Sequence, residues 1–318
     1  MQFVTMALVV LGLGVFEVVS SIDNAVINAE VLGTMTPKGR KWFLLYGILF
    51  AVFVVRGLLP WAIVWLTNPS IGPIGALTAT FSNDPAVAAS IERSTPVLML
   101  GGGIFLLFLF LHWLFLEPKS IGLPAERLFL RAGVWFYAAV SVILVGVVAL
   151  SLRIDPLLAL SAVIGSSAFF ITDGFKKNAE ENERRLMDGT RALSDLSKIL
   201  YLEIIDMTFS IDGVLGAFAF TMSVPLIILG NGLGALVVRQ LTMGSVDRIR
   251  KYAYLKNGAM YSILVLGAVM VLEGFHAEVP PYVTPISTLA IIGYFFVRSV
   301  LKARRDAAAS GDASGPAR

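Results

Sequence analysis

The chain has 318 residues, of which 57% are hydrophobic and 15% are charged, whereas a soluble domain carries about 25% charged residues. It has no cysteine and two histidines, His112 and His276, which excludes disulfides, thiolate chemistry and the usual Cys/His zinc sites. The formal net charge of +3 is small. Cationic residues lie in short segments between apolar runs, a pattern typical of membrane proteins rather than of nucleic-acid-binding proteins. We therefore expect a protein in the lipid bilayer with no nucleic-acid partner.

The first apolar run is expected to stay in the protein as a membrane helix. It begins at Met1 without a basic segment, carries Glu17 in its middle and lacks a small-residue cleavage site. These features argue against a signal peptide.

Long apolar runs predict the fold class. A helix needs about 20 residues to cross a hydrocarbon core of roughly 30 Å. By this criterion we expect an all-α, polytopic transmembrane helix bundle of about nine spans, of which the fifth and seventh are short. The predicted spans lie near residues 3–33, 42–66, 96–116, 132–152, 156–172, 199–222, 225–241, 257–273 and 282–301.

The distribution of Lys and Arg predicts the orientation of the chain. Every second connection is basic, whereas the intervening loops, including 67–95, are poor in Lys and Arg. The positive-inside rule therefore places the N-terminus outside and the C-terminus in the cytoplasm. The basic segments contain Lys38, Arg40 and Lys41, then Lys119, Arg127 and Arg131, then Lys176, Lys177, Arg184 and Arg185, then Arg248, Arg250, Lys251 and Lys256, and finally Lys302, Arg304 and Arg305.

The spans and loops divide the chain into five parts. The charged segment 173–198 is expected to be a solvated cytoplasmic connection rather than a regulatory site, and the Ala-, Ser-, Gly- and Asp-rich tail is expected to be disordered. The predicted parts are a first transmembrane repeat with an acidic motif (1–116), an inserted helix pair (117–172), the charged connection (173–198), a second repeat (199–305) and the tail (306–318).

A short acidic motif occurs twice. In the first and sixth spans an acid is followed by Ser at +4 and by Asp at +6, and the next spans share a Gly that precedes Val-Val-Arg at equal spacing. Because five spans separate the starts of the copies, the repeat is inverted, an arrangement that places a substrate site near the membrane midplane. The matching positions are Glu17, Ser21 and Asp23 with Asp206, Ser210 and Asp212, and Gly47 and Arg56 with Gly230 and Arg239.

The intramembrane charges indicate a cation site. Five acids against two arginines leave a charge of −3 if all are ionised, which metal ions or protons must balance. Arg56 and Arg239 are expected to compensate charge, because a guanidinium does not coordinate metal. The five acids are Glu17, Asp23, Glu203, Asp206 and Asp212, of which Glu203 fits a helix–helix salt bridge as well as a ligand.

Helix geometry adds a condition on this site. Ser21 and Asn24 lie within ~40° of Glu17 on a helix, whereas Asp23 points ~120° away. A break near residues 21–24 would free backbone carbonyls and turn Asp23 inward. Oxygen donors suit Mg²⁺, Ca²⁺ and Mn²⁺. The predicted metal ligands are Glu17, Ser21, Asp23, Asn24, Asp206, Ser210 and Asp212.

The paired motifs resemble those of the TerC family of integral membrane proteins, named for tellurite resistance. The resemblance covers spans one to three and six to nine, and Asp206 stands where that family commonly has Glu. The chain is therefore identified as a member of a divergent, domain-of-unknown-function branch of the group. The resemblance implies Mn²⁺ efflux, or related metal homeostasis, in a bacterial inner (plasma) membrane. We expect no permanently bound cofactor, and Mn²⁺ or another hard divalent cation as the transported ion. An acidic pocket would repel a tellurite oxyanion.

Two other classes of function remain open. One is a membrane scaffold or sensor of a metal or tellurite stress-resistance complex, for which oligomeric or complex partners are not specified by the sequence. The other is an intramembrane aspartyl protease, in which two embedded Asp share a proton. The sequence lacks a Gly-x-Gly-Asp motif. We therefore expect a transporter and no enzyme.

Overall fold

A computed structural model of the chain describes residues 2–47, 50–78, 85–187, 194–244 and 252–312. Within these ranges the chain is helical and contains no strand, which confirms the predicted all-α bundle. Among the described residues, six helices are long and apolar enough to cross a membrane. The predicted count of nine stays a prediction, because residues 42–66, 199–222 and 225–241 form shorter or interrupted helices. The six segments are Phe3–Ser20, Ala89–Leu116, Gly133–Ser151, Pro156–Asn178, Leu255–Gly274 and Val283–Asp306.

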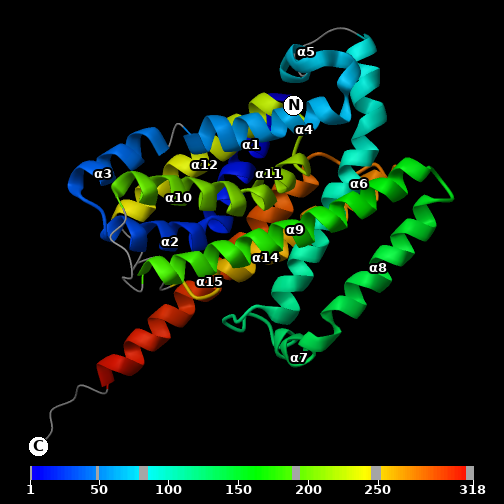
Figure 1. Cartoon of the computed structure of the whole chain (residues 1–318). Coiled ribbons are helices and arrows are strands. Elements are labelled where there is room, and N and C mark those ends of the chain that lie inside the picture. Colours follow the sequence, from blue (N-terminus) through cyan, green and yellow to red (C-terminus); the bar gives the residue numbers. More distant parts are fainter. Residues whose placement is uncertain (1, 48–49, 79–84, 188–193, 245–251, 313–318) are drawn as a thin grey trace, which may run out of the picture.

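Helix α6 (Pro85–Leu116) runs through the centre of the bundle and packs on α14 (Leu255–Gly274) and on α9 (Pro156–Met187) (Figure 1). Glycines on α6 face both neighbours. Gly101 lies against Gly165 of α9, and a Cβ at Gly103 would come within 3.0 Å of the carbonyl oxygen of Gly267 of α14. Small residues let helix backbones approach closely in a membrane, which stabilises packing without a hydrophobic driving force between helices.

The first span is interrupted where a break was predicted. Helix α1 (Gln2–Ser20) ends one residue before α2 (Ile22–Gly33) begins, and Ser21 has φ −88° and ψ 7°. The interruption is a kink rather than an unwound segment. The Ser21 amide donates to the Glu17 carbonyl at 3.1 Å, and the Ala25 amide donates to the Ser21 carbonyl at 2.9 Å.

The sixth span is interrupted at the matching serine. Helix α10 (Asp195–Phe209) and α11 (Ile211–Phe218) meet at Ser210, which has φ −93° and ψ −7°. Helix α12 (Val224–Gly244) follows and packs along α1. The two motif serines therefore occupy nearly the same backbone conformation at the two helix junctions.

The second span contains π-helical turns, which the sequence analysis did not predict. Helices η1 (Phe43–Gly47) and η2 (Phe50–Leu58) are π-helical, and α4 (Leu59–Thr67) continues the same path. Such turns are rare and frequently occur at functional sites. Arg56 lies in η2, so the wider turn determines where its side chain enters the bundle.

The segments with predicted cytoplasmic location lie at one end of the bundle. Helix α3 (Pro37–Trp42) and the C-terminal ends of α9 and α15 (Val283–Asp312) lie at the end opposite to the N-terminus and α5 (Gly72–Thr78) (Figure 1). The Thr36 amide donates to Asp195 Oδ1 at 3.3 Å, and Lys198 Nζ donates to the Thr34 carbonyl at 2.9 Å. Which end is cytoplasmic stays a prediction.

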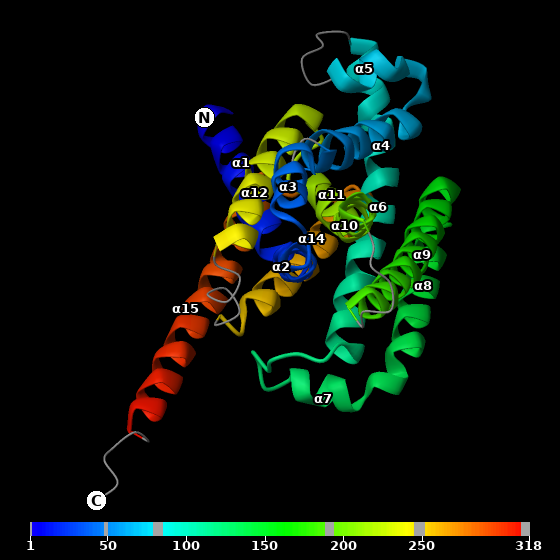
Figure 2. The same cartoon turned by 60° about the vertical axis from the view of Figure 1, so that its left-hand side comes forward.

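The inserted helices form a pair on one side of the bundle. Helix α8 (Phe136–Ser151) runs beside α9, and both stand apart from α15, which extends beyond the bundle (Figure 2). The remaining short elements are η3 (Pro69–Ile71), α7 (Glu126–Arg131) and η5 (Gly133–Trp135).

Helices extend into two of the predicted parts of the chain. The connection expected at 173–198 begins as a continuation of α9 to Met187, and residues 188–193 lie outside the described ranges. The tail, expected to be disordered from residue 306, is helical to Asp312. Alanine has the highest helix propensity of all amino acids, so the run Ala307-Ala308-Ala309 favours this extension of α15. Residues 313–318 lie outside the described ranges.

Candidate functional site

The centre of the site is an arginine that bridges two buried acids. Glu17 comes from the last turn of α1, Arg56 from η2 and Asp206 from α10. Arg56 Nη2 and Nε donate to Glu17 Oε1 at 2.5 and 2.9 Å, and Arg56 Nη1 donates to Asp206 Oδ2 at 3.3 Å. Glu17 and Arg56 are each 2% exposed. The structure thus brings together the leading acids of both motif copies, which are far apart in sequence.

The surroundings of Glu17 explain its position. Ser21 Oγ donates to Glu17 Oε1 at 2.8 Å, so these two side chains lie on one face at the end of α1. Two glycines of the second half make room for the side chain. A Cβ at Gly234 would lie 2.6 Å from the Glu17 Cβ, and a Cβ at Gly213 would lie 3.1 Å from Glu17 Oε2. The sequence analysis did not identify this role of Gly213 and Gly234.

In the second motif copy, Asp206 and Ser210 are buried, while Asp212 lies in the first turn of α11. The positive end of the helix dipole favours a carboxylate there. Lys176 Nζ of α9 lies 3.3 Å from Asp212 Oδ2. Among the described residues, Asp212 Oδ1 has no hydrogen-bond partner although it is buried. The contact with Lys176 was not predicted, because the sequence placed Lys176 in a solvated connection.

Arg239 pairs with Glu203. Its Nη2 lies 3.5 Å from Glu203 Oε1, and its Nη1 donates to the Phe43 carbonyl at 3.2 Å. The guanidinium also lies 4.0 Å from the centre of the Phe43 ring, a cation–π distance. The salt-bridge interpretation of Glu203 therefore fits the structure, and Arg239 compensates charge one helical turn away from Asp206.

Two predicted ligands are not placed by the structure. The backbone of Asp23 and Asn24 lies in α2, but their side chains are outside the described part of the chain. Their ligand roles stay predictions. In the part that is described, no group of three or more His, Asp or Glu side chains is arranged to hold a metal ion. The described acids of the site instead contact arginine or lysine side chains.

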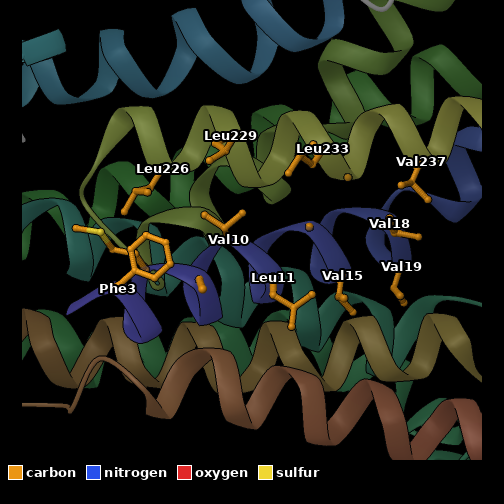
Figure 3. Close-up of a pocket in the computed structure, with 14 residues that line it drawn as sticks. Phe3, Val10, Leu11, Val15, Val18, Val19, Leu226, Leu229, Leu233 and Val237 are labelled. Atoms are coloured by element: carbon orange, nitrogen blue, oxygen red, sulfur yellow. The ribbon is translucent and has the colours of Figure 1, made fainter. Parts of the chain in front are cut away.

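A groove of about 740 Å³ runs between α1 and α12, close to this site. Figure 3 shows its apolar lining, which includes Phe3, Leu11, Val15, Leu229 and Leu233. None of its lining side chains is titratable, so the groove supplies no ligand for a cation. The polar site lies behind it, where Gly234 contacts Glu17.

A second charged cluster joins α6, α9 and α14. His112 Nε2 lies 3.3 Å from Asp173 Oδ1, and His112 Nδ1 lies 3.6 Å from Glu117 Oε1. Lys256 Nζ lies 2.8 Å from Glu117 Oε2. Burial opposes ionisation of Glu117, but the interactions with His112 and Lys256 outweigh it and lower the pKa of Glu117 to about 2. This cluster stabilises helix packing at one end of the bundle.

Comparison with known proteins places the chain in a family. Residues 22–306 match the family described as "Protein of unknown function (DUF475)". The chain is 32% identical over 82 residues to the "Uncharacterized membrane protein YceF" of Bacillus subtilis, which covers 26% of the chain and 32% of that protein. It is 27% identical over 144 residues to the "Uncharacterized membrane protein STKORF319" of Myxococcus xanthus, which covers 45% of the chain and 43% of that protein. Each match thus spans less than half of the relative. No solved structure matches.

Proposed function

We propose that this chain, which belongs to the DUF475 family, exports a hard divalent metal ion, with Mn²⁺ as the first candidate. The observation that carries the proposal is that Glu17 and Asp206 contact the same guanidinium group. Arg56 Nη2 lies 2.5 Å from Glu17 Oε1, and Arg56 Nη1 lies 3.3 Å from Asp206 Oδ2. Ionisable groups at membrane depth are costly and commonly mark an ion pathway. Both acids precede a helix junction, at Ser21 and Ser210. Interrupted helices are typical of ion sites in transporters.

The charges of the site favour a cation. If all are ionised, the four described acids of the site exceed its three described cations by one. Asp23, whose side chain is not described, would add a further negative charge. A divalent ion would compensate this excess. The acids are Glu17, Glu203, Asp206 and Asp212, and the cations are Arg56, Arg239 and Lys176.

The donor atoms favour a hard ion. Carboxylate, hydroxyl and amide oxygens line the motif, whereas the chain has no cysteine. Such donors suit Mn²⁺, Mg²⁺ and Ca²⁺ better than Cu⁺. The resemblance to the TerC group makes Mn²⁺ the first ion to test.

The paired carboxylates support transport over proteolysis. An aspartyl protease needs two acids that share one proton. Here the guanidinium of Arg56 lies between Glu17 and Asp206. It contacts both carboxylates and compensates their charge when no cation is bound.

The test is metal flux in proteoliposomes of the purified full chain, with Mn²⁺ compared with Mg²⁺, Ca²⁺ and Zn²⁺. Asp23→Asn, Asp206→Asn and Asp212→Asn should each lower Mn²⁺ flux at least tenfold, because each removes an anionic oxygen and keeps the side-chain volume. Glu278→Gln, at an exposed position between α14 and α15, is the matched control. Absence of flux for all four ions, or wild-type flux from all three Asn variants, would contradict the proposal.

A further inference from the structure

Lys176 provides a cation to the second motif from outside both repeats. Its Nζ lies 3.3 Å from Asp212 Oδ2, and each of the two side chains is 16% exposed. The neighbouring Lys177 points elsewhere, because its Nζ lies 2.6 Å from Asp173 and its side chain is 59% exposed. Two adjacent lysines of α9 therefore differ in their partner and in their burial.

The position of Lys176 is fixed by the packing of α9. Gly165 lies against the backbone of Gly101, and Ser161 Oγ donates to the Val97 carbonyl of α6. One turn before Lys176, Asp173 lies 3.3 Å from His112 of α6. The inserted helix is thus held at several points, and it presents the ammonium group to Asp212.

The carboxylate of Asp212 retains an unused oxygen. Oδ2 contacts the ammonium group, whereas Oδ1 is buried and has no hydrogen-bond partner among the described residues. A buried acceptor without a partner is energetically unfavourable. A divalent cation at this carboxylate would contact the oxygens with twice the charge of the ammonium group, so it would satisfy the acid better than Lys176 does.

We propose that Lys176 is a tethered competitor of the transported cation at Asp212. The ammonium group compensates the carboxylate before the metal ion binds and after it leaves, and the ion must displace it to bind. Lys176 thereby lowers the affinity of the site and lowers the cost of releasing the ion. It also raises selectivity for divalent over monovalent cations, because a monovalent ion gains no charge advantage over the ammonium group. This inference rests on the proposed function.

The first test is equilibrium binding of Mn²⁺ to the purified full chain, measured by calorimetry for Lys176→Gln and for the control Lys177→Gln. Loss of the competitor should tighten Mn²⁺ binding about tenfold in Lys176→Gln, within the usual range of coupling between two ligands. Lys177→Gln should bind as the wild type does. A general structural defect would weaken binding, so a gain in affinity reports competition. Unchanged or weaker binding in Lys176→Gln would overturn the inference.

The second test measures the pair by a double-mutant cycle of Lys176→Gln and Asp212→Asn in thermal unfolding. We expect coupling between the two positions without metal and loss of that coupling at saturating Mn²⁺, because the ion replaces the ammonium group. Coupling between the two positions that persists at saturating Mn²⁺ would overturn the inference. Absence of coupling without metal would overturn it as well. A wild type that neither binds nor moves a divalent ion would instead contradict the proposed function.

Discussion

Gly213 leaves the space in which the carboxylate of Glu17 lies, since a Cβ at position 213 would come 3.1 Å from Glu17 Oε2. The two residues belong to different motif copies, on α11 and α1. The carboxylate of Glu17, the first acid of the first motif, therefore packs against the backbone of the second motif at Gly213. A larger side chain at position 213 would displace this carboxylate and so change the site that both motifs form.

Gly213→Val should displace the Glu17 carboxylate and lower Mn²⁺ flux at least tenfold. The added side chain overpacks a buried position, which commonly costs about 1–3 kcal/mol of stability. Flux is measured in proteoliposomes and normalised to folded protein by size-exclusion chromatography. Gly293→Ala is the control, because no atom of the described chain lies within 4 Å of a Cβ at that position. Equal flux from Gly213→Val and wild type would contradict the role assigned to this contact.

Hydropathy predicted the fold class and several of the long helices. Apolar runs identified the long helices α6, α9, α14 and α15, because each exceeds the length that crosses a bilayer. Helical spacing placed Ser21 on the same face as Glu17, and in the structure the two side chains are hydrogen-bonded at 2.8 Å. These features depend on residues close in sequence.

Features that depend on tertiary contacts were not predicted. Lys176 appeared to be one of several cations in a solvated connection, since its pairing with Asp212 requires α9 to continue beyond residue 172. Arg239 was matched to Arg56 by spacing, yet it contacts Glu203. The π-helical turns of η2 shift Arg56 out of a regular helical register. Sequence spacing carries no information on such shifts.

Arg56→Gln should reduce thermal stability and slow transport, while equilibrium Mn²⁺ binding is kept or becomes tighter. Breaking a buried ion pair costs about 3–5 kcal/mol, because a buried charge is left without its partner. Here the loss removes the guanidinium that contacts both Glu17 and Asp206. Mn²⁺ should therefore stabilise the variant more than the wild type.

The measurement for Arg56 is thermal unfolding of the full chain with and without Mn²⁺, together with calorimetry and flux. Arg93→Gln is the control, because Arg93 is exposed and lies far in sequence from Glu17 and Asp206. Much weaker Mn²⁺ binding by Arg56→Gln than by wild type would contradict the charge-compensating role.

Glu126 is expected to be structural. Its buried carboxylate accepts from the amides of Gly122 and Leu123 at 2.9 and 3.0 Å, from Asn257 Nδ2 at 3.1 Å and from the Tyr261 hydroxyl at 3.1 Å. Glu126→Gln turns an amide group toward these donors and should cost roughly 1–3 kcal/mol of stability. Thermal unfolding measures this loss, and Arg127→Gln, at an exposed position, is the control. Flux per folded protein should stay at the wild-type level, whereas a selective loss of flux would assign Glu126 to the transport site.

Glu117 should make the stability of the bundle depend on acidic pH. Its pKa lies at about 2 in the folded chain, below the ordinary value of 4.5, because the interactions with His112 and Lys256 outweigh the opposing effect of burial. A group with a lowered folded pKa adds stability above its unfolded pKa and loses it as the pH falls through the folded pKa. The contribution of Glu117 should therefore be complete above about pH 4.5 and decline toward pH 2. The measurement is the difference in melting temperature between wild type and Glu117→Gln from pH 6 to pH 3, with Glu278→Gln as the exposed control. This difference in melting temperature should shrink as the pH falls. A difference that stays constant over the range would contradict the ion pair with Lys256 as the source of the stability that Glu117 contributes.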